Sequence, residues 1–223
     1  MSFDFTDTGN DDCVFCSIVA GQSEAKWEVS PSRGSKVACF NNRLKWVRVM
    51  LLIVPSEHMT QREFWTSDVL CDAAEMAIEM GNTHCSSDGY RVISNFGLKA
   101  HQSQSHAHLH VISGESKSLE NGNQKSALSV ANDFSVDEFE IAETPFAARI
   151  SPTNPQSQRD MWKSNRILDA ASIAMEVASS HSPDGFRLMS SFGPATSDDR
   201  SASNPADLFL LGGGQLGLYG SSY

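Results

Sequence analysis

The chain has 223 residues and a formal net charge of −10, from 17 basic and 27 acidic side chains. Such a field repels a nucleic acid, and no Lys/Arg cluster interrupts it, so we expect no nucleic acid partner. With 40% hydrophobic and 20% charged residues, the composition is typical of one large or two small folded domains. The longest apolar run, Val47 to Val54, is too short for a membrane span and contains Arg48, so we expect no membrane partner.

The N-terminal segment and the cysteines indicate the compartment. Residues 1–11 are acidic and polar and lack the basic and apolar regions of a signal peptide, so we expect a disordered N-terminus on a cytoplasmic protein. Five cysteines form an odd set, which argues against a disulfide framework. Metal ligands or free thiols are the expected roles.

An internal duplication organises the chain. The segment 61–65 (QREFW) recurs as 158–162 (QRDMW), an offset of 97 positions (158 − 61). Between the two copies, the stretch from Gly114 to Asn132 is rich in Ser, Asn, Gly, Lys and Glu, which is typical of a solvated linker. The sequence therefore predicts two tandem domains, 12–114 and 134–214, a linker over 115–133, and a flexible tail over 215–223.

Each copy has the pattern of an α+β unit. In the first copy we expect strands over 36–40 and 47–54, followed by one helix of several turns that begins near residue 61. Two further strands are expected over 90–94 and 107–113. Helical spacing of apolar residues recurs after the second Gln-Arg pair, so we predict a mostly antiparallel sheet with helices in both copies.

Three alternating histidines mark the strongest candidate site. His106, His108 and His110 project from one face of the expected strand because strand side chains repeat with period two. Burying several imidazoles without partners would cost about 1–3 kcal/mol each. The cluster therefore indicates catalysis or metal binding rather than a core.

A second candidate is the pair Cys13 and Cys16, whose two-residue gap lets both thiolates reach one tetrahedral ion. Alone, this spacing leaves zinc, redox chemistry and coincidence open. The redox interpretation needs a βαβ context that the segment lacks, and the nearby histidines supply nitrogen ligands, so zinc is favoured.

The segment from His106 to Ile112 (HAHLHVI), with DCVFCSI at 12–18 and LLIVPSEH at 51–58, resembles the histidine triad (HIT) family. The resemblance implies a HIT-like fold and a nucleotide or nucleotide-conjugate substrate. In such proteins the central histidine, here His108, attacks the α-phosphorus, while His110 donates to a phosphate oxygen. Asn95 and Ser103 match positions that contact ribose or phosphate. The resemblance also implies a structural Zn²⁺, because the members with a CxxC pair complete a zinc site with His58 and His106 and the two cysteines.

Two positions depart from the family pattern. Asn42 stands where a carboxylate usually binds the ribose hydroxyls, so we count it as a substrate-binding candidate of altered character. Met50 stands where many members carry a further histidine, and a thioether cannot donate a hydrogen bond. The base and the leaving group are therefore left open.

The second copy has lost the triad. Asp207 and Phe209 align with His108 and His110, and Pro205 aligns with His106. HIT proteins commonly pair as twofold dimers, so we expect the copies to pack as an intrachain pseudo-dimer in a monomeric chain.

We therefore expect a hydrolase of phosphoric esters, anhydrides or phosphoramidates, or a nucleotidyltransferase, that forms a covalent nucleotidyl-histidine. The alternative is a catalytically weak scaffold that binds a nucleotide or a metal.

Overall fold

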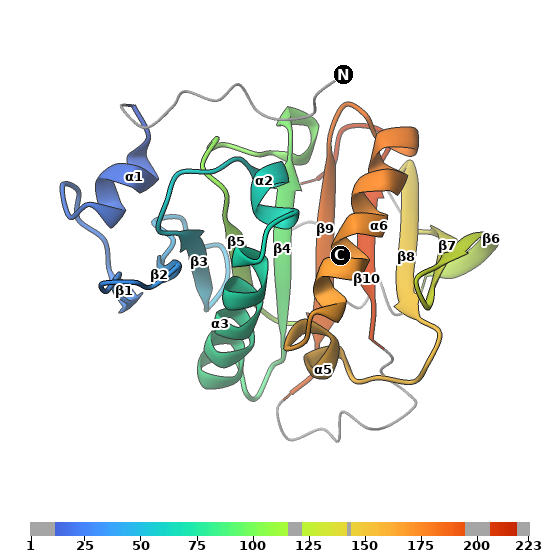
Figure 1. The fold of residues 1–223 in the computed structure, drawn as a ribbon, viewed down its shortest axis with the longest axis horizontal. Coiled ribbons are helices and arrows are strands. Elements are labelled where there is room, and N and C mark those ends of the chain that lie inside the picture. The colour runs from blue at the N-terminus through green and yellow to red at the C-terminus, as the bar shows by residue number, and fades with distance from the viewer. Residues whose placement is uncertain (1–11, 116–121, 142–143, 195–205, 218–223) are drawn as a thin grey trace.

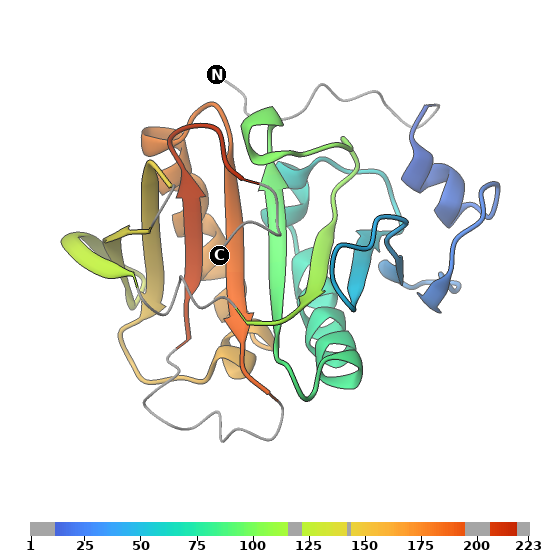
Figure 2. The same ribbon diagram turned by 180° about the vertical axis from the view of Figure 1, so that it is seen from behind.

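The computed structural model describes residues 12–115, 122–141, 144–194 and 206–217. The expected disordered N-terminus lies outside these residues. One antiparallel sheet runs through the molecule, and the longer helices lie together on one face of it, while the opposite face is seen from behind (Figures 1 and 2). In the described part of the chain, no helix is long and apolar enough to cross a membrane.

The two copies contribute five strands and two helices each in the same order, and the first half adds α1 and η1. The first half contains α1 (Val14–Val19), β1 (Trp27–Val29), β2 (Val37–Asn41), β3 (Met50–Pro55), α2 (Gln61–Trp65), α3 (Val69–His84), β4 (Tyr90–Phe96), the 3₁₀ turn η1 (Leu98–Ala100) and β5 (Leu109–Ser113). The second half contains β6 (Asn123–Ala131), β7 (Phe134–Glu140), β8 (Phe146–Pro152), α5 (Gln158–Trp162), α6 (Arg166–His181), β9 (Phe186–Phe192) and β10 (Leu208–Gly212).

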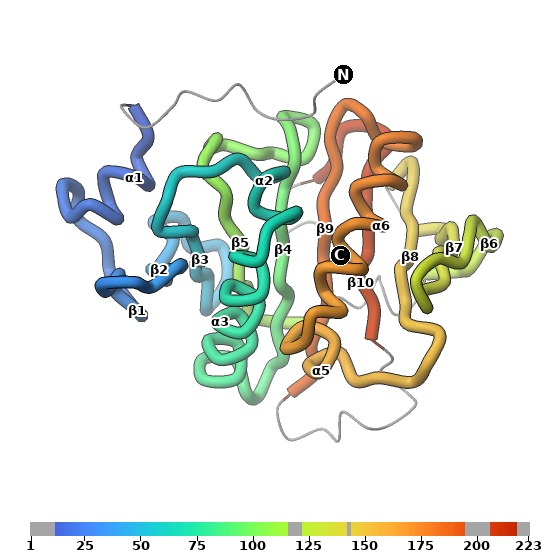
Figure 3. The backbone as a smooth tube through the Cα atoms, viewed as in Figure 1, coloured from blue at the N-terminus to red at the C-terminus, as the bar shows by residue number. Residues whose placement is uncertain are grey.

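The strand order is β1-β2-β3-β5-β4-β9-β10-β8-β7-β6. The strands of the second half follow in the reverse order of their counterparts in the first half, so that β4 and β9 are counterparts that pair with each other. The halves are therefore related by a pseudo-twofold axis, and the predicted antiparallel α+β fold is confirmed. Strands β4 and β9 lie side by side at the centre (Figure 3).

Aromatic side chains hold this central junction together. Phe96 stacks on Phe186 with ring centroids 4.2 Å apart, and Tyr90 stacks on Phe192 at 4.6 Å. Such pairs contribute roughly 0.5–1.5 kcal/mol each beyond the apolar area they bury. The expected intrachain pseudo-dimer is thus one continuous sheet with a shared core.

The predicted single helix after residue 61 is two helices in the structure, α2 and α3. Thr66 Oγ1 donates to the Arg62 carbonyl at 2.8 Å, and Ser67 Oγ donates to the Phe64 carbonyl at 3.0 Å. Hydroxyl side chains that bond back to the preceding turn compete with helix continuation, so α2 ends here. The apolar periodicity continues across the break and conceals it.

The predicted linker and tail also differ from the structure. Strand β6 lies inside the expected linker 115–133 and pairs with β7, although nearly all of its side chains are exposed. Leu216, expected in the flexible tail 215–223, is only 2% exposed, and its N–H donates to the Lys99 carbonyl at 2.9 Å. Leu216 is therefore packed against the first half, while residues 218–223 of the tail lie outside the described residues.

Two faces of the sheet carry separate cores. The larger core lies between the sheet and helices α2, α3, α5 and α6. On the opposite face of the first half, Phe15 and Ile18 of α1 pack against Phe40 and Leu52. Helix α1 therefore walls a region that the other helices leave uncovered, and the histidines lie in it.

Candidate active site and metal centre

The three histidines share one face, as their alternation predicts. Ala107 and Leu109 between them pack into the helix-side core. Strand β5 begins at Leu109, so His106 and His108 belong to the extended segment before the strand rather than to the strand itself. All three imidazoles are buried.

A buried glutamine fixes the backbone of the central histidine. Gln61 Oε1 accepts the His108 N–H at 3.1 Å, and Gln61 Nε2 donates to the His108 carbonyl at 3.0 Å. The side-chain amide thus satisfies backbone groups that lie outside the regular strand pairing. Our sequence reasoning did not assign Gln61 to the site, although its recurrence as Gln158 was an available signal.

The His108 ring has a defined orientation. Its Nδ1 lies 2.9 Å from the His106 carbonyl, which can only accept, so Nδ1 carries the proton and donates. Burial lowers the pKa of His108, and the bond to the His106 carbonyl partly opposes that effect. A neutral imidazole with this tautomer has a lone pair on Nε2, which is the arrangement a nucleophilic histidine needs.

His110 lies beside His108, with ring centroids 4.9 Å apart. Burial lowers the pKa of His110 well below its usual range, and the charges of His108 and Arg187 lower it further. His110 is therefore neutral near pH 7 and can donate one N–H to an anionic oxygen.

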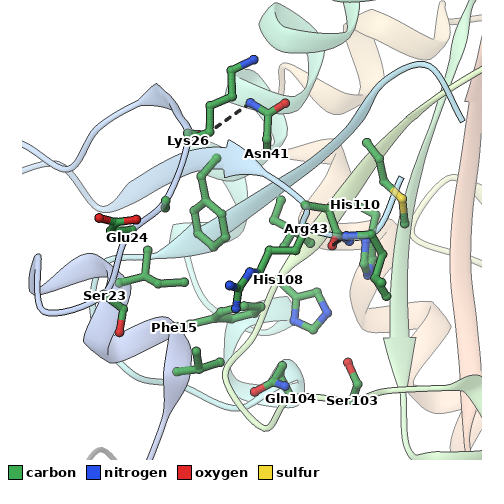
Figure 4. Close-up of a pocket in the computed structure, with 18 of the residues that line it drawn as sticks. Phe15, Ser23, Glu24, Lys26, Asn41, Arg43, Ser103, Gln104, His108 and His110 are labelled. Atoms are coloured by element: carbon green, nitrogen blue, oxygen red, sulfur yellow. Dashed lines mark hydrogen bonds between the residues drawn. The ribbon is translucent and has the colours of Figure 1, made fainter. Parts of the chain in front are cut away.

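A cleft of about 1670 Å³ opens in front of these two imidazoles. Helix α1, the β2–β3 loop and the 98–104 segment form its walls, and Figure 4 shows Phe15 and Arg43 reaching toward His108. Three cationic side chains, Lys26, Arg43 and Lys45, line the cleft together with one carboxylate, Glu24, so the lining carries a net positive charge although the whole chain is acidic. The local charge therefore favours an anionic ligand.

The predicted substrate-binding residues occupy different positions. Asn42 and Ser103 both line the cleft, as does Met50. Asn42 Oδ1 accepts the Leu44 N–H at 3.0 Å, so this oxygen shapes its own loop. Asn95 is fully buried and is absent from the described lining of the cleft. Its Oδ1 instead accepts a hydrogen bond from Arg187 of the second half, a contact that our sequence analysis missed.

The four predicted metal ligands meet at one point. The donor atoms of Cys13, Cys16, His58 and His106 all lie within 4.8 Å of one another. Cys16 Sγ is 3.2 Å from His58 Nδ1 and 3.4 Å from His106 Nδ1. These residues come from α1, the loop after β3 and the lead into β5, so the cluster ties three segments together.

The chemistry of this cluster fits a metal ion. His106 Nε2 lies 3.0 Å from the Pro55 carbonyl and donates to it, which leaves the Nδ1 lone pair facing the sulfur atoms. A carbonyl that holds the outer ring nitrogen is the usual support of a metal-binding histidine. Two thiolates and two imidazoles could hold one tetrahedral ion.

The equivalent region of the second half keeps the support and lacks the imidazoles. Gln158 Oε1 accepts the Asp207 N–H at 2.7 Å, and Gln158 Nε2 donates to the Asp207 carbonyl at 2.7 Å. Burial raises the pKa of Asp207 to about 7, and the charge of Arg149 partly opposes the shift. Phe209 packs edge-on against Phe139 where the first half has His110. Position 205 lies outside the described residues.

Comparisons with known proteins agree with this geometry. Residues 35–117 match the HIT domain family. An uncharacterized HIT-like protein from Chlamydia muridarum is 35% identical over 69 residues, which are 30% of this chain and 55% of that protein. The aligned region thus spans about half the length of this curated relative. The first half of the chain therefore matches a HIT domain over residues 35–117.

Two solved structures resemble the chain over both halves. A GalT-like protein from Arabidopsis thaliana aligns with a TM-score of 0.64 and 14% identity, covering 94% of this chain and 84% of that one. An ADP-glucose phosphorylase from Arabidopsis thaliana, with ADP-glucose bound, aligns with the same TM-score and identity and covers 94% and 82%. At this identity, the likeness concerns the two-domain fold.

Proposed function

We propose that the first half is a nucleotidyl hydrolase or nucleotidyltransferase that acts through a covalent intermediate on His108. The observation that carries the proposal is the fixed tautomer of His108, whose Nδ1–H is held by the His106 carbonyl while Gln61 clamps its backbone. Such an imidazole presents Nε2 to the cleft without reorganisation.

The first chemical step is attack of His108 Nε2 on the α-phosphorus of a nucleotide conjugate. A phosphorus–nitrogen bond forms, the bond to the leaving group breaks, and the leaving group departs with the electron pair. In the second step, water or another acceptor attacks the same phosphorus, and the phosphorus–nitrogen bond breaks to restore neutral His108. Through its N–H, His110 stabilises the growing charge on a non-bridging oxygen.

The substrate class follows from the cleft and the neighbours. Lys26, Arg43 and Lys45 line the cleft and would attract a phosphorylated ligand. The ADP-glucose phosphorylase with a related two-domain fold supports a nucleotide sugar or a similar conjugate. Asn42 and Ser103 are the lining residues that we propose for contacts with the ligand. Asn95 does not line the cleft, and we propose that it supports the site through its hydrogen bond with Arg187.

We propose that the cysteine–histidine cluster holds one structural Zn²⁺. Cys13, Cys16, His58 and His106 would be its ligands, and the bound ion would supply cross-linking rather than chemistry. His106 precedes His108 by two residues, so anchoring His106 also holds the carbonyl that orients the nucleophile.

The experiment is a rapid acid-free quench of the full chain with ADP-glucose labelled at the α-phosphorus. We expect label on the wild-type protein at early times and none on His108→Ala. Because phosphoramidate bonds are labile to acid, the adduct should resist mild base and disappear after acid. Binding of AMP without any trapped adduct or turnover across a panel of nucleotide conjugates would favour the scaffold alternative.

A further inference from the structure

Arg187 belongs to β9 of the second half, but its side chain ends in the first half. It is 1% exposed, and its Nε donates to Asn95 Oδ1 at 2.8 Å. Its Nη2 donates to the Gly217 carbonyl at 3.0 Å and approaches the Ala100 carbonyl at 3.5 Å. The guanidinium group is therefore fixed where the two halves and the C-terminal segment meet.

These acceptors adjoin the wall of the cleft. Ala100 ends η1, and the residues that follow it, 101–104, all line the cleft. Gln102 is 4% exposed, and its Oε1 accepts the Gly97 N–H at 2.7 Å, so the loop is folded onto itself. Arg187 thus holds the start of a wall that carries Ser103.

Arg187 also places a positive charge next to the histidines. Asn95 and Ile93 share one face of β4, and Ile93 is the cross-strand partner of His110. The charge of Arg187 is one of the causes that lower the pKa of His110. A phosphate held by His110 would bring negative charge to this region, where a fixed cation in a buried environment acts strongly.

On the basis of the function proposed above, we infer that Arg187 is a positioning residue supplied by the degenerate half. It fixes Asn95 and the 97–104 segment, and it favours the phosphate charge at His110. The active site is then shared between the two halves, although all three histidines belong to the first.

The pseudo-twofold axis provides an internal control, Arg91. Arg91 and Arg187 occupy matching positions in the duplication, and Arg91 is also buried, with its Nε donating to the Gly114 carbonyl at 3.0 Å. In the register of β4 and β9, Arg91 faces Ser191 where Arg187 faces Asn95. An arginine that merely braces the sheet should matter equally at both positions.

The test compares Arg187→Gln and Arg187→Lys with Arg91→Gln and Arg91→Lys in the full chain. Calorimetry measures the affinities for AMP and for adenosine, which lacks the phosphate, and thermal unfolding reports stability. We expect Arg187→Gln to weaken AMP binding by about tenfold while adenosine binding changes less than about twofold. Arg187→Lys should recover part of the loss, and both Arg91 variants should bind AMP like the wild type.

Equal losses for AMP and adenosine, or equal effects of Arg187→Gln and Arg91→Gln, would overturn the inference. If Arg187→Gln does not fold, the comparison of Arg187→Lys with Arg91→Lys decides, because the lysine keeps the charge and loses the fork that holds Asn95 and the carbonyls. In that case we expect Arg187→Lys, and not Arg91→Lys, to have a lower kcat for ADP-glucose than the wild type. A wild-type chain that binds none of a panel of nucleoside monophosphates and nucleotide sugars with different bases would instead refute the proposed function, and the inference with it.

Discussion

The two halves have the same backbone scaffold and differ in the side chains that they carry at the positions of the histidine triad. Gln61 and Gln158 clamp equivalent backbone segments, and Trp65 Nε1 and Trp162 Nε1 donate to Ser94 and Ser190 at 2.9 and 3.1 Å. The first half presents imidazoles on its clamped segment, and the second presents a carboxyl and a phenyl group at the matching positions. The machinery that shapes the segment is thus separable from the chemistry that it carries.

The difference also shows what the second half still has to do. Its helices and β9 supply the surface that completes the core of the first half, and the Trp65 and Trp162 rings meet across the junction at 6.4 Å. These contacts need aromatic and aliphatic positions but no histidines. Retention of the Gln and Trp positions alongside loss of the triad is what a structural role predicts.

The largest expected difference between the halves is in turnover. We expect His108→Ala to lower kcat for a nucleotide conjugate by at least about 10³-fold, because the nucleophile is removed. Asp207→Ala at the matching position should stay within about threefold of the wild type. Initial rates with ADP-glucose measure both variants, and a cooperative thermal transition above the assay temperature serves as the folding control for each. Equal losses in the two variants would mean that the chemistry is not confined to the first half.

The next largest difference between the halves is the metal centre, because the described residues of the second half contain no counterpart to the cysteine pair. We expect about one zinc ion per wild-type chain by elemental analysis. Cys16→Ser should lose the metal and unfold several degrees lower, because a structural zinc contributes folding free energy. Cys71→Ser, on α3 outside the cluster, is the matched control and should keep the metal. Wild-type protein purified without chelator that contains no metal would contradict the assignment.

The glutamine clamps provide a subtler comparison. Gln61→Ala and Gln158→Ala each leave buried backbone groups of the clamped segment unpaired, so both should reduce the free energy of unfolding by about 1–3 kcal/mol in urea titrations. Only Gln61→Ala should also lower kcat, by about 10- to 100-fold, because Gln61 positions His108. An equal effect of both variants on kcat would show that the clamps act through overall stability.

The smallest effect concerns the pH dependence of stability through Asp207. Its pKa is raised from 3.8 to about 7 in the folded protein, so the native state binds more protons than the unfolded state between these values. The stabilisation is therefore complete below about pH 4 and is lost as the pH rises through 7. At pH 8 the free energy of unfolding of Asp207→Asn, measured by urea titration, should therefore exceed that of the wild type. The difference should vanish near pH 4, and a constant difference at all pH values would contradict this account.

Features with a local pattern could be predicted from the sequence. The alternation of His106, His108 and His110 sets their common face, and the recurrence of residues 61–65 as 158–162 indicates the duplication. The ligand quartet followed from the resemblance to proteins with a CxxC pair. In each case the signal lies in short motifs whose residue types and spacing can be read directly from the sequence.

Features that depend on contacts between the halves could not be predicted in this way. Asn95 matched a ligand-contacting position, but Arg187 lies 92 residues away along the chain and has no local signature that aims it there. Strand β6 has almost no buried face, so its sequence lacks the apolar alternation that marks a strand. Leu216 is a single apolar residue in a glycine-rich segment, and only tertiary packing reveals its burial.

The central pairing of β4 with β9 has a consequence for biosynthesis. Phe96 is translated 90 residues before its stacking partner Phe186 (186 − 96), which corresponds to about 5–20 s at common elongation rates. During that interval β4 is an open edge, and the first half of one nascent chain offers the same edge to a neighbouring ribosome's product. On densely loaded polysomes, the misfolded species to expect are therefore assemblies in which β4 of one chain pairs with a strand of another chain. Prompt synthesis of β9 protects against them because β9 covers the open edge of β4.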